Sequence, residues 1–207
     1  MSVISVIGNI ASGKSTLLSA LRQEGFATAL EPVNEWKFLP KFYEDPNRWA
    51  FALQVEVLNS FITSNGCKGR LSFTERSAWE SYVIFCKNAY NNGYLIEEEY
   101  NVLGEIATYA NDKPDVFVYL KSTPTTCYRR MMCRARPCEE KVTLDYLTKL
   151  HEIYERTIQD LVKSDDRKII TLDGDLSENE IIGELLKNVS LHNLIHQQTN
   201  PFDRAFC

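Results

Sequence analysis

Hydrophobic and polar positions follow two different periods along this chain. Longer segments repeat their apolar residues every three or four positions, which is the spacing of a helix with one buried face. Short, nearly continuous apolar runs stand between them and predict strands at residues 3–7, 26–30, 71–74, 115–120 and 168–172. Strands that alternate with helices indicate a parallel sheet covered on both faces. We therefore predict an α/β fold in which about five strands form a parallel sheet flanked by helices.

Start and stop signals bound the predicted helices. Asp45 and Pro46 supply a cap and a first-turn proline for one helix, and an Asn-Gly pair at 65–66 ends it. Ser177 is followed three positions later by Glu180, which is a capping-box pattern. Helices are predicted at residues 14–22, 46–64, 77–91, 125–136, 144–162 and 177–188.

Composition narrows the setting. With 207 residues, 44% of them hydrophobic, the chain can bury one sizeable core, and no linker rich in proline, glycine or serine divides it. We predict one domain over residues 1–190, followed by a tail at 191–207 whose role the sequence does not indicate. The net charge of −5 and the pI near 5.3 argue against a nucleic-acid partner, because such a partner requires a basic surface.

The same survey bears on location. No apolar run reaches the length of a membrane span and no signal peptide precedes the first strand, so we expect no membrane partner and a cytoplasmic location. The six cysteines lack the spacing of a zinc site, and without a secretory signal we expect them to stay reduced.

The candidate chemistry begins directly after the first predicted strand. The run Gly8-x-x-x-x-Gly13-Lys14-Ser15 opens a predicted helix, which is the context of a phosphate-binding P-loop. Backbone N–H groups of such a turn point into one concavity at a helix N-terminus and bind phosphate oxygens. Lys14 is predicted to reach the β- and γ-phosphates of ATP, and the Ser15 hydroxyl to hold Mg²⁺. The predicted nucleotide-binding residues of this loop are Gly8, Asn9, Ile10, Ala11, Ser12, Gly13, Lys14, Ser15 and Thr16.

A P-loop serves hydrolysis, phosphoryl transfer or a nucleotide-controlled switch, so other residues decide the reaction. Glu31, Glu75 and Asp173 follow predicted strands at the edge of the sheet where ligands bind, and we expect them near Gly8. Glu31 is the candidate base for an acceptor hydroxyl, with a helix cap or an ion pair to a lysine as the alternative. Asp173 is predicted to contact the bound nucleotide.

Two further groups of residues complete the predicted site. Arg130, Arg134 and Arg136 lie on one basic segment ahead of Pro137 and two glutamates, which suggests a lid that clamps phosphates; the alternative is a solvated helix face. A planar heterocycle would stack between aromatic rings beside the amide of Gln54, although each ring taken singly is more often part of a core. The candidate rings are Trp36, Phe42, Tyr43, Phe51, Phe61 and Phe85.

Five motifs in order resemble those of the deoxynucleoside kinases related to deoxycytidine kinase, mitochondrial thymidine kinase and the insect multisubstrate kinase. The motifs are Gly8-x-x-x-x-Gly-Lys-Ser, Glu31-Pro-Val-x-x-Trp36, Tyr43-x-x-Pro-x-x-Trp49 with Gln54, Glu75-Arg-Ser77 and Arg134-Ala-Arg136. The resemblance runs from about residue 3 to 185 and implies the P-loop kinase fold. It implies phosphorylation of a deoxynucleoside by ATP at the 5′-hydroxyl.

The resemblance also implies roles for single residues. Glu31 would be the general base, supported by Arg76, with Lys14 as the third catalytic residue. Glu75 would help Ser15 hold Mg²⁺. Tyr43 and Glu155 would grip the sugar 3′-hydroxyl, Gln54 would read the base edge, and Trp36 and Phe85 would pack on the base. The implied substrate-binding set is Glu31, Trp36, Tyr43, Gln54, Val57, Phe61, Arg76, Ser81, Phe85 and Glu155.

Base choice follows from two positions in this set. Relatives that accept deoxycytidine with purines carry an Arg and an Asp where this chain has Phe61 and Ser81. Without that charged pair the chain resembles the thymidine-accepting branch, so we predict a preference for thymidine and deoxycytidine, in a pocket narrowed by Phe61. The resemblance further implies a homodimer whose interface comes from residues 46–64 and 77–91.

Two rival readings remain open. A nucleoside monophosphate kinase such as thymidylate kinase shares the fold and the P-loop, but usually carries an Asp-Arg-Tyr motif where this chain has Glu75-Arg-Ser77. A non-catalytic nucleotide-binding protein is the second rival. It has no need for a base such as Glu31.

Overall fold

The computed structural model describes residues 2–64, 71–110, 114–164 and 168–188, and every structural statement concerns these parts of the chain. Five parallel strands form one sheet in the order β2-β3-β1-β4-β5. Their bounds are β1 (Ser2–Ile7), β2 (Ala27–Ala29), β3 (Leu71–Glu75), β4 (Val116–Lys121) and β5 (Lys168–Asp173). The prediction of an α/β fold with a five-stranded parallel sheet is confirmed.

The sequence of β1 explains its central place. Ile4 and Val6 are fully buried and Ile7 almost so, and Ser5 between them is equally inaccessible. A strand that is apolar on both faces is stable only between two neighbouring strands and under helices on both sides. β1 therefore pairs with β3 on one side and with β4 on the other.

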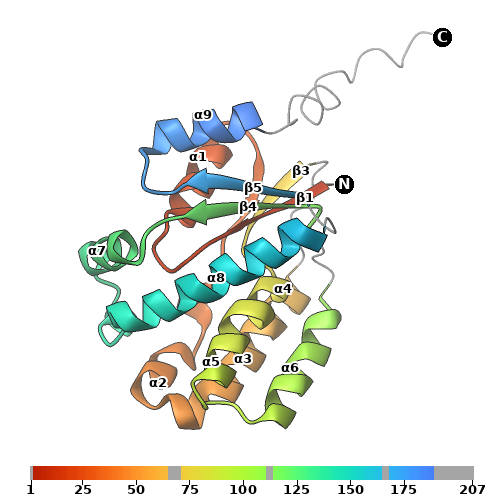
Figure 1. Cartoon of the computed structure of the whole chain (residues 1–207), viewed down its shortest axis with the longest axis vertical. Helices are drawn as coiled ribbons and strands as arrows, with labels where there is room; N and C mark the ends of the chain where they lie inside the picture. Colours follow the sequence, from red (N-terminus) through yellow and green to blue (C-terminus); the bar gives the residue numbers. More distant parts are fainter. Residues whose placement is uncertain (1, 65–70, 111–113, 165–167, 189–207) are drawn as a thin grey trace, which may run out of the picture.

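Helices cover both faces of the sheet (Figure 1). On one face, α1 (Lys14–Gln23) and α9 (Glu178–Asn188) enclose a core that includes Leu18, Phe73 and Leu120. On the other face, α8 (Leu144–Ser164) packs Leu150 and Tyr154 against side chains of β1 and β4. The predicted helices at these positions are confirmed, within two residues at their ends.

A second, largely helical core lies beyond the α8 face. It is built from α2 (Leu39–Glu44), α3 (Pro46–Thr63), α4 (Ala78–Glu80), η2 (Ser81–Cys86), α5 (Lys87–Asn91) and α6 (Glu97–Thr108). The predicted helix 77–91 is continuous in space, but η2 within it is π-helical. Such wide turns are frequent at functional sites, because they re-aim side chains. The sequence analysis did not predict α2 and α6.

The arginine-bearing segment forms α7 (Pro124–Arg134), which ends two residues earlier than predicted. Ala135 takes a left-handed conformation with φ 51°, and this stops the helix. Two short 3₁₀ turns, η1 (Val33–Glu35) and η3 (Pro137–Glu139), complete the fold. Among the described residues, no helix has the length and apolar character needed to cross a membrane. The tail predicted at 191–207 lies outside the described residues.

Candidate active site

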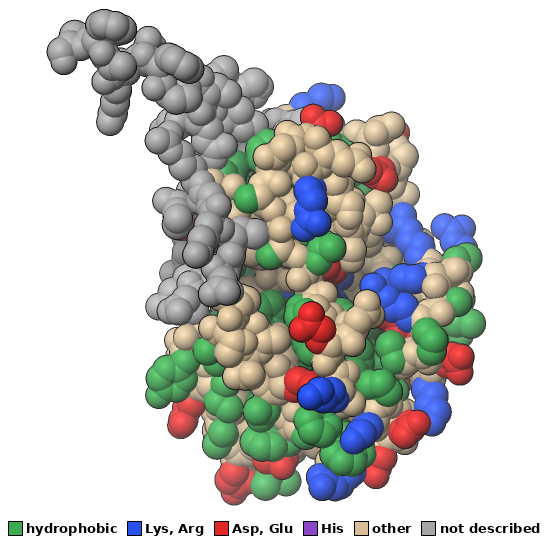
Figure 2. All heavy atoms as spheres, turned by 180° about the vertical axis from the view of Figure 1, so that it is seen from behind, with side chains coloured by type: hydrophobic (Ala, Val, Ile, Leu, Met, Phe, Trp, Pro, Cys, Tyr) green, Lys and Arg blue, Asp and Glu red, His purple; other side chains and the backbone are tan. Residues whose placement is uncertain are grey.

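The carboxyl ends of the strands open into one cavity of about 620 Å³, a volume typical of small-molecule sites. Figure 2 shows the face that carries this hollow, with Lys and Arg side chains gathered at one end of it. The P-loop lines one end of the cavity, and side chains of α2, α3 and η2 line the other. The cavity therefore joins the phosphate-binding loop to the aromatic residues that the sequence analysis singled out.

The P-loop follows β1 and ends at the N-terminus of α1. Gly8 and Gly13 have φ angles of 148° and 107°, which side chains other than glycine rarely allow. A Cβ atom at Gly8 would lie 2.7 Å from the carbonyl oxygen of Leu120, so this position also needs glycine for space. Ser12 is buried and its hydroxyl has no partner in the described residues.

Lys14 is buried beneath this loop. Its ammonium group donates to the carbonyl oxygens of Gly8, at 3.1 Å, and Asn9, at 2.8 Å. Burial, together with the nearby Arg76, lowers the pKa of Lys14 to about 8. Phosphate oxygens bound nearby would stabilise the charged form of Lys14, so an anion that enters the site would raise its pKa again.

Ser15 and Glu75 meet at the start of α1. The Ser15 hydroxyl donates to the two carboxylate oxygens of Glu75 at 2.9 and 3.1 Å. The sheet register explains the meeting, since Val6 of β1 pairs with Glu75 of β3 two residues before the P-loop begins. A hydroxyl and one carboxylate suit Mg²⁺, which binds nucleotide phosphates and few protein groups. No cluster of three or more His, Cys, Asp or Glu that could hold a metal ion occurs in the described parts of the chain.

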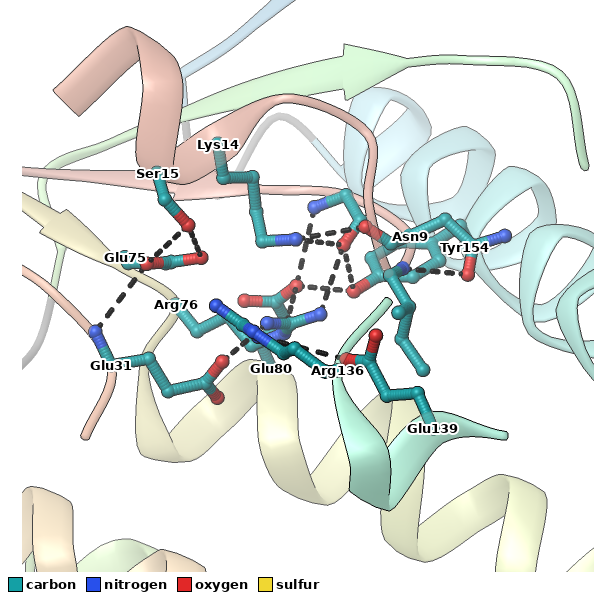
Figure 3. A network of polar contacts seen from close by, with 12 residues as sticks. Asn9, Lys14, Ser15, Glu31, Glu75, Arg76, Glu80, Arg136, Glu139 and Tyr154 are labelled. Carbon is teal, nitrogen blue, oxygen red and sulfur yellow. Dashed lines mark hydrogen bonds and ion pairs between the residues drawn. The ribbon is translucent and has the colours of Figure 1, made fainter. Parts of the chain in front are cut away.

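Glu31 and Arg76 form a buried ion pair at 2.6 Å (Figure 3). Arg76 has a left-handed backbone with φ 63°, and the surrounding contacts hold it there. Its N–H bonds the Val6 carbonyl at 3.1 Å and its guanidinium donates to the Gly8 carbonyl at 3.3 Å. Burial, with a smaller contribution from Glu75, raises the pKa of Glu31 above its ordinary value despite Arg76. Glu31 thus pairs with an arginine, and neither the helix cap nor the lysine pair is formed.

The opposite end of the cavity is shaped for a flat, partly polar molecule. Gln54 is nearly inaccessible, and the Cys86 thiol donates to its Oε1 atom at 3.4 Å. The guanidinium of Arg76 lies 4.8 Å from the centre of the Phe85 ring. Six residues predicted to bind the substrate line this end, namely Trp36, Tyr43, Gln54, Val57, Ser81 and Phe85.

The three predicted lid arginines line the cavity as well. Arg130 donates to the Gly174 carbonyl at 2.7 Å and to the Ser12 carbonyl at 3.3 Å, so it lies beside the P-loop. Arg134 bonds both carboxylate oxygens of Glu139 at 2.7 Å, and Arg136 lies 3.6 Å from the same carboxylate. Arg134 and Arg136 are therefore held by the buried carboxylate of Glu139 and do not form a solvated helix face.

Five predicted site residues do not line the cavity: Gly8 and Asn9 of the P-loop, and Phe61, Glu155 and Asp173. Glu155 accepts hydrogen bonds from the Tyr119 hydroxyl, at 2.9 Å, and from Lys121, at 2.6 Å. Its neighbour Tyr154 faces the P-loop, and one residue along a helix turns the side chain by about 100°. Phe61 packs within the helical core, so it does not narrow the pocket. Asp173 accepts from the N–H of Asp175 at 2.9 Å and turns the chain there.

Sequence reasoning missed a carboxylate that the structure brings to the cavity. Glu139 is buried, lines the cavity and lies close to Tyr43. Burial raises the pKa of the Tyr43 hydroxyl, and Tyr146 and Glu139 add to the shift. The available signal was an acid three residues after Arg136, within reach of both arginines.

A family model described as deoxynucleoside kinase matches residues 4–196. The chain is 35% identical over 169 residues to a probable deoxycytidine kinase of fowlpox virus, covering 76% of this chain and 72% of that one. It is 35% identical over 167 residues to the mitochondrial thymidine kinase 2 of Macaca fascicularis, covering 74% of this chain and 63% of that one.

The fold is also similar to a solved structure of the deoxyadenosine kinase from M. mycoides. The TM-score is 0.81 at 21% sequence identity, and the match covers 93% of this chain and 99% of that one.

Substituting Gly8→Ala tests whether the P-loop binds the phosphates. The added Cβ would meet the Leu120 carbonyl at 2.7 Å and the Ser12 hydroxyl at 2.8 Å, so we expect affinity for a nucleoside triphosphate to fall at least about tenfold. Isothermal titration calorimetry would measure it. Gly183→Ala is the matched control, because nothing lies within 4 Å of its added Cβ. Unchanged affinity in Gly8→Ala would contradict the assignment of the P-loop as the phosphate-binding site.

Proposed function

The chain belongs to the deoxynucleoside kinase family, and from this premise we propose that it transfers the γ-phosphoryl group of ATP to the 5′-hydroxyl of a pyrimidine deoxynucleoside. Family membership makes the protein a phosphotransferase that uses a nucleotide as phosphoryl donor. The observation that carries the finer proposal is the position of Glu31. This buried carboxylate lines the same cavity as the P-loop and the aromatic end.

The donor end supports ATP with Mg²⁺. The P-loop amides and Lys14 would hold the β- and γ-phosphates, and Arg130 lies beside the same loop. Ser15 and Glu75 would hold Mg²⁺, which supplies charge neutralisation between the phosphates. The lid residues Arg134 and Arg136 would add positive charge to the transferring group when they exchange Glu139 for phosphate oxygens.

The transfer step needs a base for the acceptor alcohol. Glu31 accepts the proton of the 5′-hydroxyl as the oxygen forms its bond to the γ-phosphorus, and the bond from that phosphorus to the β-phosphate oxygen breaks. The products are the deoxynucleoside monophosphate and ADP. Burial raises the pKa of Glu31, and this makes it a stronger base than an ordinary carboxylate. Arg76 keeps the carboxylate oriented through its 2.6 Å contact.

The proposed preference for pyrimidines rests on Ser81, while Gln54 supplies the contact with the base edge. An amide offers one donor and one acceptor, the pair that the edge of thymine or cytosine requires. Ser81 is small and uncharged where purine-accepting relatives carry an Asp. The relatives' names include deoxycytidine, thymidine and deoxyadenosine kinases, so base choice is a matter of this pocket rather than of the family. A cytoplasmic location fits the four described cysteines, which are free thiols.

The first experiment is transfer of phosphate from Mg²⁺-ATP to thymidine, deoxycytidine, deoxyadenosine, deoxyguanosine and thymidine monophosphate. We expect the two pyrimidine deoxynucleosides to react best, and Glu31→Gln to lower kcat by at least about 100-fold because the base is lost. Glu35→Gln, an exposed neighbour in the same loop, is the control. Reaction of the monophosphate alone would indicate a monophosphate kinase, and strong purine phosphorylation would overturn the base preference.

We propose that Tyr43 and Glu139 hold the sugar. Both line the cavity, and a hydroxyl beside a carboxylate suits the 3′-hydroxyl of a deoxyribose, which both donates and accepts. This assignment replaces Glu155, which does not line the cavity and whose carboxylate binds Tyr119 and Lys121 instead.

Tyr43→Phe and Glu139→Gln should each raise KM for thymidine about tenfold, since a hydrogen bond to a charged group contributes roughly 1.5–3 kcal/mol. Glu155→Gln should leave KM within about twofold. Steady-state kinetics with both substrates varied would separate an effect on thymidine from a lid effect on ATP. An increase in KM with Glu155→Gln alone would restore the original assignment.

We also propose a homodimer, formed through α3 and α6. The segment 77–91 packs against α3, α6 and α8, and all its residues but Asn91 are at least partly buried, so it exposes less surface than α6. α6 carries the exposed side chain of Val102, and the exposed Tyr109 follows the helix.

Light scattering at micromolar concentration should give a dimer for the wild-type protein and a monomer for Val102→Asp, because a charge in an apolar interface is costly. Val162→Asp, on an exposed apolar residue of α8, should leave the dimer intact. A wild-type monomer would refute the proposal.

A further inference from the structure

Glu80 is a fully buried acid to which the proposed reaction assigns no role. It is the last residue of α4 and lies behind the P-loop (Figure 3). The N–H of Gly8 donates to its Oε1 atom at 3.3 Å, and the Nε atom of Arg76 lies 3.7 Å from the same oxygen. Its Oε2 atom has no hydrogen-bond partner among the described residues. Glu80 therefore touches both the start of the P-loop and the arginine that orients Glu31.

Tyr154 of α8 completes this contact from the other side. It is fully buried, its hydroxyl oxygen lies 2.9 Å from the Gly8 carbonyl oxygen, and it also forms a very short contact with Oε1 of Glu80. A phenol has one hydrogen to donate, and the carbonyl can only accept. If Glu80 were ionised, Tyr154 could satisfy only one of these two contacts.

A protonated Glu80 satisfies both. Its O–H then donates to the Tyr154 oxygen, and the Tyr154 hydroxyl donates to the Gly8 carbonyl. Every hydrogen in this series of hydrogen bonds, from Glu80 through Tyr154 to Gly8, then has an acceptor, as buried polar groups require. Proton counting thus favours the neutral acid.

The surrounding charges agree. Lys14 and Arg76 carry two positive charges near Glu80, and Glu31 and Glu75 carry two negative charges. These four charges cancel, so an ionised Glu80 would add an uncompensated negative charge behind the P-loop. Arg76 makes its 2.6 Å contact with Glu31 and lies farther from Glu80. Burial raises the pKa of Glu80 to about 7, with a smaller contribution from Glu31, against the opposing effects of Arg76, Tyr154 and Lys14.

The last acceptor in this series is the Gly8 carbonyl, which also accepts hydrogen bonds from Lys14 at 3.1 Å and from Arg76 at 3.3 Å. A shift of this one oxygen would move both cations. Arg76 in addition holds a left-handed backbone, a conformation that persists only when neighbouring contacts enforce it.

We propose that Glu80 is a protonated carboxylic acid which, through Tyr154, holds the Gly8 carbonyl and thereby positions Lys14 and Arg76 for phosphoryl transfer. Glu80 and Tyr154 are positioning residues, since neither lines the substrate cavity. The kinetic part of this inference rests on the proposed function. The protonation state does not.

Two nearly isosteric substitutions separate the roles. In Glu80→Gln the amide N–H replaces the acid O–H as donor to Tyr154, so kcat should stay within about threefold of the wild type. Tyr154→Phe removes the link to Gly8, and kcat should fall about 10- to 100-fold, as for a small misplacement of catalytic groups, with KM for thymidine within about twofold. Tyr109→Phe, at an exposed tyrosine, is the control, and thermal unfolding of each variant verifies that it is folded.

An infrared difference spectrum of the wild type minus Glu80→Gln, recorded at pH 6, tests protonation directly. We expect the C=O stretching band of a protonated carboxyl group, which the variant lacks. Absence of this band, or a loss of kcat in Glu80→Gln as large as in Tyr154→Phe, would overturn the proposal. If no acceptor reacts in any variant, the proposed function fails while the infrared result still decides the state of Glu80.

Discussion

The site depends on one carbonyl group, that of Gly8 at the end of β1. Lys14, Arg76 and Tyr154 all donate to this oxygen, from α1, from the end of β3 and from α8. The central strand brings it there because β1 is buried between β3 and β4. Glycine is required at this point, since a side chain would meet the Leu120 carbonyl. The geometry of the phosphate site is therefore inherited from the packing of the sheet.

Burial supplies the second constraint. Lys14, Arg76, Glu31 and Glu80 are removed from water within a few ångströms of one another, and each is stabilised mainly by the others. Desolvation lowers the pKa of Lys14 and raises the pKa of Glu31 and Glu80, so these three groups are held nearer to neutrality than in water, whereas Arg76 keeps its charge. Such a set responds strongly to an incoming anion, which is the property that a phosphoryl-transfer site needs.

Much of this arrangement was predictable from local patterns. The P-loop, Glu31 and Glu75 stand directly after predicted strands, and parallel strands bring their carboxyl ends to one edge. The pocket residues Trp36, Tyr43, Gln54 and Phe85 were candidates because aromatic rings and an amide suit a planar base, and the family resemblance then implied their roles. α2 and α6 escaped prediction because they are short or lack a clear start signal, and their stability comes from the second core rather than from propensity.

The sequence by itself determined the alternation of the five strands with the helices that cover the sheet, the phosphate-binding loop and the carboxylates at strand ends, because these depend on neighbours in the chain. The tertiary structure alone decided that Glu139 reaches the cavity and Glu155 does not, and that Glu80 meets Tyr154 across 74 positions. The physical reason is helix rotation. A side chain turns by about 100° per residue along a helix. Which of two neighbouring residues faces the site therefore depends on how the helix packs, and the order of residues in the sequence does not specify this packing.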